Sequence, residues 1–427
     1  MPLKILAAAD LHLGRRPSRL PSELTDRIAA RELGPAGAWE RLVDLAVDEK
    51  VDALLLAGDV VEAEDDFFEA YAELHRGVTR LAEAGVRVFA VAGNHDTRVL
   101  PYLSDEVEAF ELLGRGGEWE SVHLEANGEK ATLWGWSFPQ ASVREDPVSG
   151  LSFSRGPGPN LGLLHCDRDQ VGSSYAPVSS RSLEAAGLDA WLLGHIHAPD
   201  GLSLSRPTGY LGSLTGLDPG EPGPRGAWLL TIDQGTLTEF RRVALAPLRW
   251  VRLEVSLDGL DEPEEARRRV LDRLRKLDGE IEAETLRPQA VGIRLTLTGR
   301  TSYRREVEQL FSQEALRDLP VGQSRVFYFV ETLRIETLPE VDLSALARRD
   351  DPAGLLARML ELLEAPLEDS ERRELVAGAQ RRLERVAGDP TWAGLQADLP
   401  DDNEAAEWLR RAGRRALDLL LAQRDDA

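Results

Sequence analysis

The sequence contains very little cysteine and no long apolar segment. Its 427 residues include one cysteine, Cys166, which excludes an internal disulfide and agrees with a reducing compartment. No stretch of about 18 apolar residues occurs, so we expect no membrane-spanning helix. The apolar run at 5–9 leads straight into Asp10 and is too short for the core of a signal peptide. The sequence therefore predicts a cytoplasmic protein without a membrane partner.

Positive charge is also scarce. The formal net charge is −23, from 51 basic and 74 acidic side chains. DNA-binding proteins usually carry a basic face, so this balance by itself argues against a nucleic acid as partner. Divalent cations bound in an acidic cleft would reverse the field at the point where a phosphate sits. The charge therefore lowers the expectation of a nucleic-acid enzyme without excluding one.

The sequence does contain a regular alternation of strands and helices over residues 1–245. Apolar runs typical of strands buried on both faces occupy 3–9, 53–57, 87–92, 161–164 and 190–193. Apolar residues at helical spacing fill 38–49 and 67–84. Further strands are expected at 133–138, 227–232 and 237–244. This order predicts a layered α/β fold with a mixed, double sheet.

A second unit is predicted to begin near Pro247. The order strand, helix, strand, helix, strand over 250–335 predicts a small α+β domain. From Val341 onward the pattern is helical, with apolar stripes that include Leu355 and Trp408. We found no internal repeat and no low-complexity tract. The expected domains are 1–245, 246–340 and 341–427.

Five of the seven histidines fall in short motifs, nearly all directly after a predicted strand. The motifs are Asp10-Leu11-His12, Gly58-Asp59, Gly93-Asn94-His95-Asp96, His165 and Gly194-His195-Ile196-His197. Buried parallel strands commonly deliver functional groups at their carboxyl ends. Mixed oxygen and imidazole ligands suit manganese, iron or zinc better than magnesium or calcium. Seven side chains are candidate ligands: Asp10, His12, Asp59, Asn94, His165, His195 and His197. So many ligands suit a pair of cations about 3.5–4 Å apart better than a single cation.

Each motif alone has an ordinary structural explanation. A single Asp-x-His or Gly-Asp at a strand end is usually a cap or a turn, whereas all five motifs in one order are hard to attribute to coincidence. His75 and His123 lie outside the pattern, and we interpret them as ordinary, partly exposed residues. Cys166 adjoins His165, and we interpret it as a small buried residue rather than a ligand.

Together these motifs resemble those of the calcineurin-like metallophosphoesterase superfamily, which reads D-x-H, G-D, G-N-H-D, H and G-H-x-H in this order. The resemblance covers residues 1 to about 245 and implies a layered αββα sandwich. Three segments look like the DNA repair exonuclease branch with its SbcD/YhaO-type nucleases: Asp10-Leu11-His12-Leu13-Gly14, Leu164-His165-Cys166, and Tyr210-Leu211-Gly212-Ser213 followed by Gly223-Pro224-Arg225-Gly226. The second unit resembles that branch's small α+β capping domain, which a helical C-terminal tail would follow.

The resemblance also implies a role for each site residue. Asp10, His12, Asp59 and His197 would hold a first cation, and Asp59, Asn94, His165 and His195 a second, with Mn²⁺ as the expected metal. His95 would act on the leaving oxygen of the scissile phosphate, and Asp96 would orient its imidazole. One departure is visible, because Glu62 stands where the family often has the last residue of G-D-x-x-D.

The implied activity is that of a DNA nuclease. A hydroxide shared by two cations would attack phosphorus in line, and the family acts as an exonuclease in double-strand-break or end processing. Arg15, Arg16 and Arg19 would contact the DNA backbone or lie in a solvated loop, and the sequence leaves both interpretations open. The main alternative is a phosphoesterase for a nucleotide, protein or lipid phosphate, because these enzymes share the fold and the ligands. A scaffold without catalysis is disfavoured, since every ligand and His95 are present.

The helical region 341–427 admits two interpretations. In the resembling nucleases such a region docks on the coiled coil of an SMC-like ABC ATPase of the SbcC type, and its apolar stripes are typical of helices that lie in a partner's groove. The same stripes would fit packing on the chain's own domain. We prefer the ATPase partner, with DNA as substrate, and a homodimer is left open.

Overall fold

The computed structural model describes residues 1–63, 67–311, 316, 319, 321, 324–387 and 400–425. The chain divides into two compact units by its contacts. The first unit holds Met1–Val255, Glu264–Leu297 and Glu308–Ile335, and the second holds Ser256–Pro263, Thr298–Val307 and Glu336–Ala427. The three domains expected from the sequence stay a prediction.

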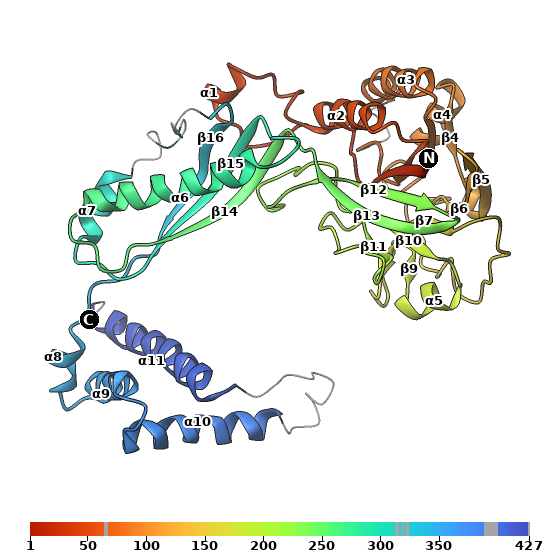
Figure 1. The fold of residues 1–427 in the computed structure, drawn as a ribbon. Helices are drawn as coiled ribbons and strands as arrows, with labels where there is room; N and C mark the ends of the chain where they lie inside the picture. Colours follow the sequence, from red (N-terminus) through yellow and green to blue (C-terminus); the bar gives the residue numbers. More distant parts are fainter. Residues whose placement is uncertain are drawn as a thin grey trace. The chain divides into compact units, whose positions relative to one another are not determined.

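Two sheets form the frame of the first unit (Figure 1). The six-stranded sheet has the order β13-β12-β1-β2-β3-β4, and its strands are β1 (Leu3–Ala8), β2 (Ala53–Ala57), β3 (Arg87–Val91), β4 (Phe110–Leu112), β12 (Gly226–Asp233) and β13 (Thr236–Ala244). The five-stranded sheet has the order β11-β10-β7-β6-β5, with β5 (Glu120–Ala126), β6 (Glu129–Trp136), β7 (Asn160–His165), β10 (Ala190–Gly194) and β11 (Thr208–Tyr210). Both sheets contain parallel and antiparallel pairs, as the predicted mixed sheet requires.

Apolar side chains of the two sheets meet in one continuous core. Ile5 and Leu55 of the first sheet pack with Leu161 and Leu192 of the second. Because side chains alternate along a strand, the residues between them face the other way and pack on helices. On the first sheet these helices are α2 (Pro35–Asp48), α3 (Phe67–Glu83) and α4 (Val99–Glu106), and on the second α5 (Ser180–Ala185). This arrangement confirms the αββα sandwich.

A three-stranded sheet follows the sandwich, formed by β14 (Leu248–Ser256), β15 (Ala290–Thr298) and β16 (Phe327–Ile335). The helices α6 (Glu264–Glu282) and α7 (Arg304–Leu310) stand between these strands in the chain. Trp250 and Phe329 of this sheet pack with Leu24 and Leu33, which belong to the segment after β1 that carries the short helix α1 (Ser22–Thr25). This apolar cluster joins the small sheet to the rest of the first unit.

The second unit contains the helices α8 (Leu343–Ala347), α9 (Pro352–Glu364), α10 (Ser370–Ala387) and α11 (Asp402–Asp425). Leu360 and Leu363 of α9 pack with Val376 of α10 and Leu417 of α11. The predicted stripe of α9 therefore packs in part on the neighbouring helices, whereas Trp408 and Leu419 of the stripe predicted in α11 are exposed. None of the helices in the described ranges combines the length and apolar character that a bilayer crossing requires.

Candidate metal centre

Side chains from five strand ends meet at one end of the sandwich. The strands β1, β2 and β3 are parallel neighbours, as are β7 and β10, so the segments that follow them lie close together. In each of two groups of three side chains, the potential ligand atoms lie within 4.8 Å of one another. The groups are Asp10 with His12 and His197, and Asp59 with His165 and His195. Asn94 adjoins the second group, because its Oδ1 lies 3.1 Å from His165 Nε2. All seven predicted ligands are thus in one cluster.

The backbone of this cluster is strained. Asp10, His12, Asp59 and His195 have φ angles of 51°, 53°, 48° and 102°, in the region that side chains with a Cβ rarely adopt. Such conformations persist only where the surrounding structure enforces them, and they are concentrated at functional sites. Asp10, His12 and Asp59 are also almost fully buried, with exposures of 0%, 1% and 2%.

Glycines allow the motif loops to approach one another. A Cβ on Gly93 would lie 2.1 Å from Asp59 Oδ1, and one on Gly58 would lie 2.5 Å from His165 Nδ1. The glycine positions of the motifs are therefore needed for the close contact of their neighbours with the ligands.

Gly93→Ala is expected to displace the Asp59 carboxylate and to lower the free energy of unfolding by about 1–3 kcal/mol, the usual cost of overpacking. Bound Mn²⁺ should fall as well. Denaturant unfolding and elemental analysis measure the two effects. Gly279→Ala in α6, with no heavy atom within 4 Å of its added Cβ, is the matched control; it should keep its metal and should not lower the free energy of unfolding, because alanine favours a helix over glycine. Equal behaviour of both variants would contradict the steric argument.

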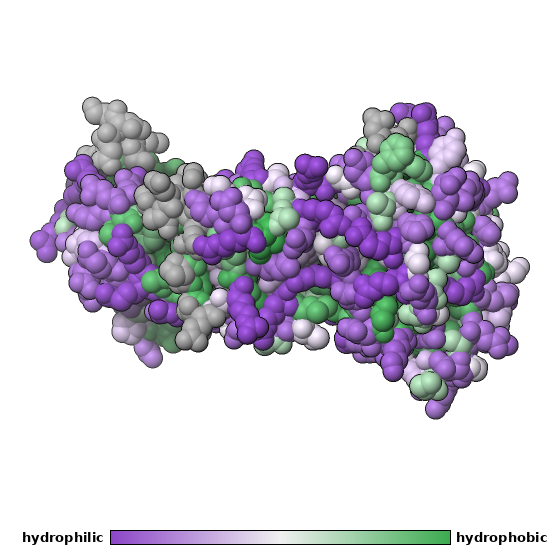
Figure 2. All heavy atoms as spheres, turned by 90° about the horizontal axis from the view of Figure 1, so that it is seen from above, coloured by the Kyte–Doolittle hydropathy of each residue, from purple (hydrophilic) through white to green (hydrophobic). Residues whose placement is uncertain are grey.

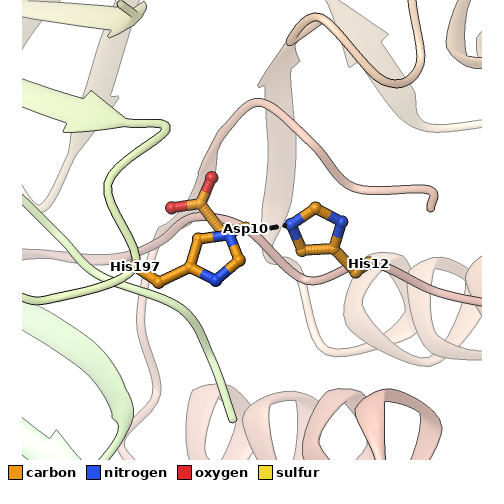
Figure 3. A group of neighbouring side chains, drawn as sticks. All are labelled: Asp10, His12 and His197. Carbon is orange, nitrogen blue, oxygen red and sulfur yellow. Dashed lines mark hydrogen bonds between the residues drawn. The ribbon is translucent and has the colours of Figure 1, made fainter. Parts of the chain in front are cut away.

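Two imidazoles of the first group, those of His12 and His197, face each other through a ring nitrogen of each (Figure 3). His197 Nδ1 lies 2.7 Å from Glu221 Oε1, so this nitrogen carries the proton and Nε2 the lone pair. His12 Nδ1 lies 2.7 Å from Glu62 Oε2, at ion-pair distance. The two Nε2 atoms are 3.1 Å apart, with Asp10 beside them. Two ring nitrogens at this distance either share a proton or bind a common cation, because two lone pairs alone would repel each other.

The second group has the same property. His165 Nδ1 donates to the carbonyl oxygen of Ala57 at 3.0 Å, which directs the lone pair of Nε2 toward the other ligands. This Nε2 lies 3.1 Å from Asn94 Oδ1 and 3.4 Å from Asp59 Oδ2. When the His165 ring is neutral, three acceptors face one another here. The donor atoms of both groups therefore fit divalent cations that accept nitrogen and oxygen ligands.

The pKa values agree with a site built to hold positive charge. Burial alone would lower the pKa of His165, but Asp59 and Asp10 outweigh it and raise this pKa to about 9. Burial would raise the pKa of Asp59, yet the imidazoles of His165, His12 and His95 lower it. Burial, together with His165, lowers the pKa of His195 to about 4, which keeps this ring in the neutral form that binds metal.

His95 and Asp96 do not form the predicted pair. The buried Asp96 carboxylate accepts hydrogen bonds from the backbone amides of Gly93 and Val60, both at 2.7 Å. The exposed His95 ring instead has its Nδ1 2.8 Å from the carbonyl oxygen of Glu62. The prediction that Asp96 orients this imidazole is therefore wrong. Asp96 ties the loop after β2 to the loop after β3.

Asp96→Asn is expected to lower the free energy of unfolding by about 1–3 kcal/mol, because one amide oxygen cannot replace two carboxylate oxygens that each accept a backbone N–H. Metal content should persist. Urea unfolding measures the loss, with Asp272→Asn on the exposed face of α6 as a control that should change little. Unchanged stability combined with loss of hydrolysis would instead restore an orienting role for Asp96.

The residues that hold the ligands in place were not predicted from the sequence. Glu221 contacts His197 Nδ1, and Asp167 Oδ1 lies 3.3 Å from His195 Nε2. Carboxylates in such positions fix the orientation of a ligating imidazole. The buried Arg225 donates to the carbonyl oxygen of His197. Of the residues near the ligands, only Glu62 was noted from the sequence, as a departure from the family pattern.

The three arginines proposed for DNA contact have different environments. Arg19 forms an ion pair with Glu331 of β16 at 2.7 Å, which gives it a structural partner. Arg15 Nη1 lies 3.8 Å from Glu62 Oε1, at the edge of the cluster, and Arg16 is exposed. Their contact with DNA stays a prediction. Cys166 is buried, and burial raises the pKa of its thiol, in line with a structural residue.

Comparison with known proteins finds two family matches. Residues 3–199 match the calcineurin-like phosphoesterase family, and residues 250–338 match the metallophosphoesterase YhaO middle domain. The uncharacterized metallophosphoesterase YhaO of Bacillus subtilis is 30% identical over 263 residues, 56% of this chain and 60% of that protein.

Proteins called DNA double-strand break repair protein Mre11 are also similar. The one from Methanopyrus kandleri is 26% identical over 294 residues, 63% of this chain and 62% of that protein. The one from Haloferax volcanii is 26% identical over 439 residues, 95% of this chain and 86% of that protein. The chain spans 60% and 62% of the length of the first two relatives.

Fold, motifs and family match define the class of this part of the chain: residues 3–199 form a calcineurin-like metallophosphoesterase domain, the domain of a family of metal-dependent phosphoester hydrolases. The middle domain and the similarity to YhaO and Mre11 proteins support the DNA repair nuclease branch of that family, as the sequence motifs indicate.

Proposed function

We propose that this chain is a DNA nuclease that hydrolyses phosphodiester bonds with two divalent cations, with Mn²⁺ as the metal. Asp10, His12, Asp59 and His197 would hold one cation, and Asp59, Asn94, His165 and His195 the other. The observation that carries this proposal is the pair of adjoining groups in which acceptor atoms face one another at 3.1 Å. Asp59, whose two oxygens face different neighbours, would connect the groups.

The chain's own residues would prepare the reaction. When bound, two cations would lower the pKa of a shared water and offset charge on the non-bridging phosphate oxygens. The backbone N–H of His95 donates to Asp59 Oδ1 at 3.0 Å, which fixes this carboxylate. Since the His95 ring donates from Nδ1 to the Glu62 carbonyl oxygen, its Nε2 is directed elsewhere. In the imidazolium form, Nε2–H would pass its proton to the leaving oxygen.

The metal ligands do not distinguish DNA from other phosphoesters, because other phosphoesterases share them. DNA as the substrate is supported by the relatives and the middle domain. We further propose an exonuclease that processes DNA ends in the cytoplasm. The alternative substrate remains a nucleotide, protein or lipid phosphate.

The second unit would supply the partner surface. Leu355 and Met359 of α9 and Trp408 of α11 are 54%, 39% and 50% exposed, although the helices bury other apolar residues among themselves. Exposed apolar side chains at helical spacing are typical of a helix that docks in a groove. We propose the coiled coil of an SMC-like ABC ATPase of the SbcC type as that partner.

Incubation of the purified chain with labelled duplex and single-stranded DNA in Mn²⁺ tests the proposal. We expect DNA to be degraded from its ends and the reaction to stop in EDTA. A small phosphomonoester is assayed in parallel, and its turnover while DNA stays intact would contradict the nuclease function and favour the alternative.

A further inference from the structure

A pocket beside the edge strand β13 gathers arginines in a chain of net charge −23. The cavity has a volume of about 340 Å³ and lies between the end of β13 and residues 283–286, which follow α6. Arg241 and Arg242 line it. Figure 1 shows β13 beside β12 at the margin of the six-stranded sheet, and all lining residues belong to the first unit. The pocket is therefore part of the body that carries the metal site.

Several guanidinium groups around this pocket donate to carbonyl oxygens. Arg242 donates to the carbonyl of Pro224, and Arg225 donates to the carbonyl of His197. Arg41 donates to two backbone carbonyls, at 3.1 and 2.9 Å. A carbonyl oxygen satisfies a hydrogen bond but carries no formal charge, so these contacts leave the positive charges in place.

The carboxylates near the pocket already have cationic partners. Glu284 is bound by both terminal nitrogens of Arg249, at 2.7 and 2.5 Å. Glu49 is bound by Arg241 at 2.8 Å and by Lys4 at 3.2 Å, and Glu239 lies 3.5 Å from Arg241. Burial, followed by the neighbouring cations Arg225 and Arg249, lowers the pKa of Arg242. The surroundings of Arg242 thus have an excess of positive charge that an anion would offset.

The pocket lies at the same end of the sandwich as the metal site. The strand β12 runs antiparallel to β1, and Ala244 at the end of β13 pairs with Gly226 at the start of β12. These residues are therefore near the end of β1, which Asp10 follows. Two strand spacings of about 4.8 Å place β13 about 10 Å from β1, which equals about three nucleotide steps along one DNA strand.

We propose that the pocket of Arg241 and Arg242 binds a backbone phosphate of the DNA substrate, about three nucleotides from the scissile bond. That the phosphate belongs to DNA rests on the proposed function, whereas the binding of a phosphate group follows from the arginines of the pocket. A phosphodiester carries one negative charge and two free oxygens, which match the forked donors of a guanidinium group. Arg225 stands between the two sites and bonds the carbonyl oxygen of the proposed ligand His197.

DNA binding by the full chain in EDTA tests this inference. Fluorescence anisotropy of a labelled duplex is measured over a series of salt concentrations. Arg242→Gln should weaken binding about tenfold and reduce the slope of log Kd against log salt by about one. Arg242→Lys, which keeps the charge, should retain most of that slope. Arg80→Gln on α3, whose partner is Asp44, removes the same charge elsewhere and should behave as the unmodified chain.

An affinity and salt slope of Arg242→Gln equal to those of Arg80→Gln would overturn the inference. A second arm measures thermal stabilisation by inorganic phosphate. If Arg242→Gln lost that stabilisation and still bound DNA normally, the pocket would take free phosphate, and the DNA assignment would be overturned.

The binding assay is independent of hydrolysis. A chain that binds DNA through Arg242 and cleaves none would contradict the proposed nuclease while supporting the pocket. Should Arg242→Gln fail to fold, Arg241→Gln replaces it, because Glu49 keeps its contact with Lys4 in that variant. The same losses in affinity and slope are expected there, and their absence would overturn the inference.

Discussion

Asp59→Ala is expected to abolish DNA hydrolysis and to weaken Mn²⁺ binding by more than about a hundredfold. Loss of a residue that only supports a ligand already lowers metal affinity by about 10- to 100-fold, so loss of a ligand should cost more. Asp59 is 2% exposed, its Oδ2 lies 3.4 Å from His165 Nε2, and its Oδ1 accepts the backbone N–H of His95, so we propose it as the ligand shared by both groups. Its removal would leave each group one ligand short. Elemental analysis after dialysis, beside a hydrolysis assay, measures both effects.

A matched control separates metal loss from general damage. Asp105→Ala removes an exposed carboxylate that is paired with Arg115, far along the chain from the motifs. It should keep its full metal content and activity. Circular dichroism would show that both variants are folded. Metal content of Asp59→Ala equal to that of the control would contradict the assignment of Asp59 as the shared ligand.

The opposite pattern is expected for His95→Ala, which should retain both cations and lose about 10²- to 10⁴-fold in the rate of DNA cleavage, the range for a general acid. The contact that His95 makes with Asp59 comes from its backbone N–H, which alanine also has. The ring itself is exposed and bonds the Glu62 carbonyl oxygen. Metal analysis and single-turnover cleavage test the two halves of this expectation.

The role of His95 as a proton donor can also be contradicted by experiment. Its ring lies with His12 and Glu62 in a third group of potential ligands within 4.8 Å. If His95→Ala lost metal in proportion to activity, the residue would be a ligand of that group rather than a proton donor. Retained metal with retained activity would remove it from the mechanism altogether.

Most of the central strands could be predicted because they are buried on both faces. The strands β1 and β2 read as unbroken apolar runs, and the structure places them within a residue of the expected ends. The strand β5 was missed because it lies at a sheet edge and carries polar residues such as Glu120 and Ser121. The strand β4, with three residues, is too short to give a pattern.

The convergence of the ligands could be predicted for a similar reason. Each of them lies at or just after the end of a buried strand, and parallel strands bring such segments to one edge. The supporting contacts could not be predicted, because they join loops that are distant in sequence. The contact of Glu221 with His197 spans 24 positions, and that of Asp96 with Val60 spans 36. No local spacing encodes either contact.

The most direct test of the central claim is DNA cleavage by metal-stripped protein during titration with Mn²⁺. We expect no cleavage before metal is added and a rise to full activity only as the second equivalent of Mn²⁺ per chain binds. Full activity without added metal, or at one equivalent, would contradict a two-cation centre built from Asp10, His12, Asp59, Asn94, His165, His195 and His197.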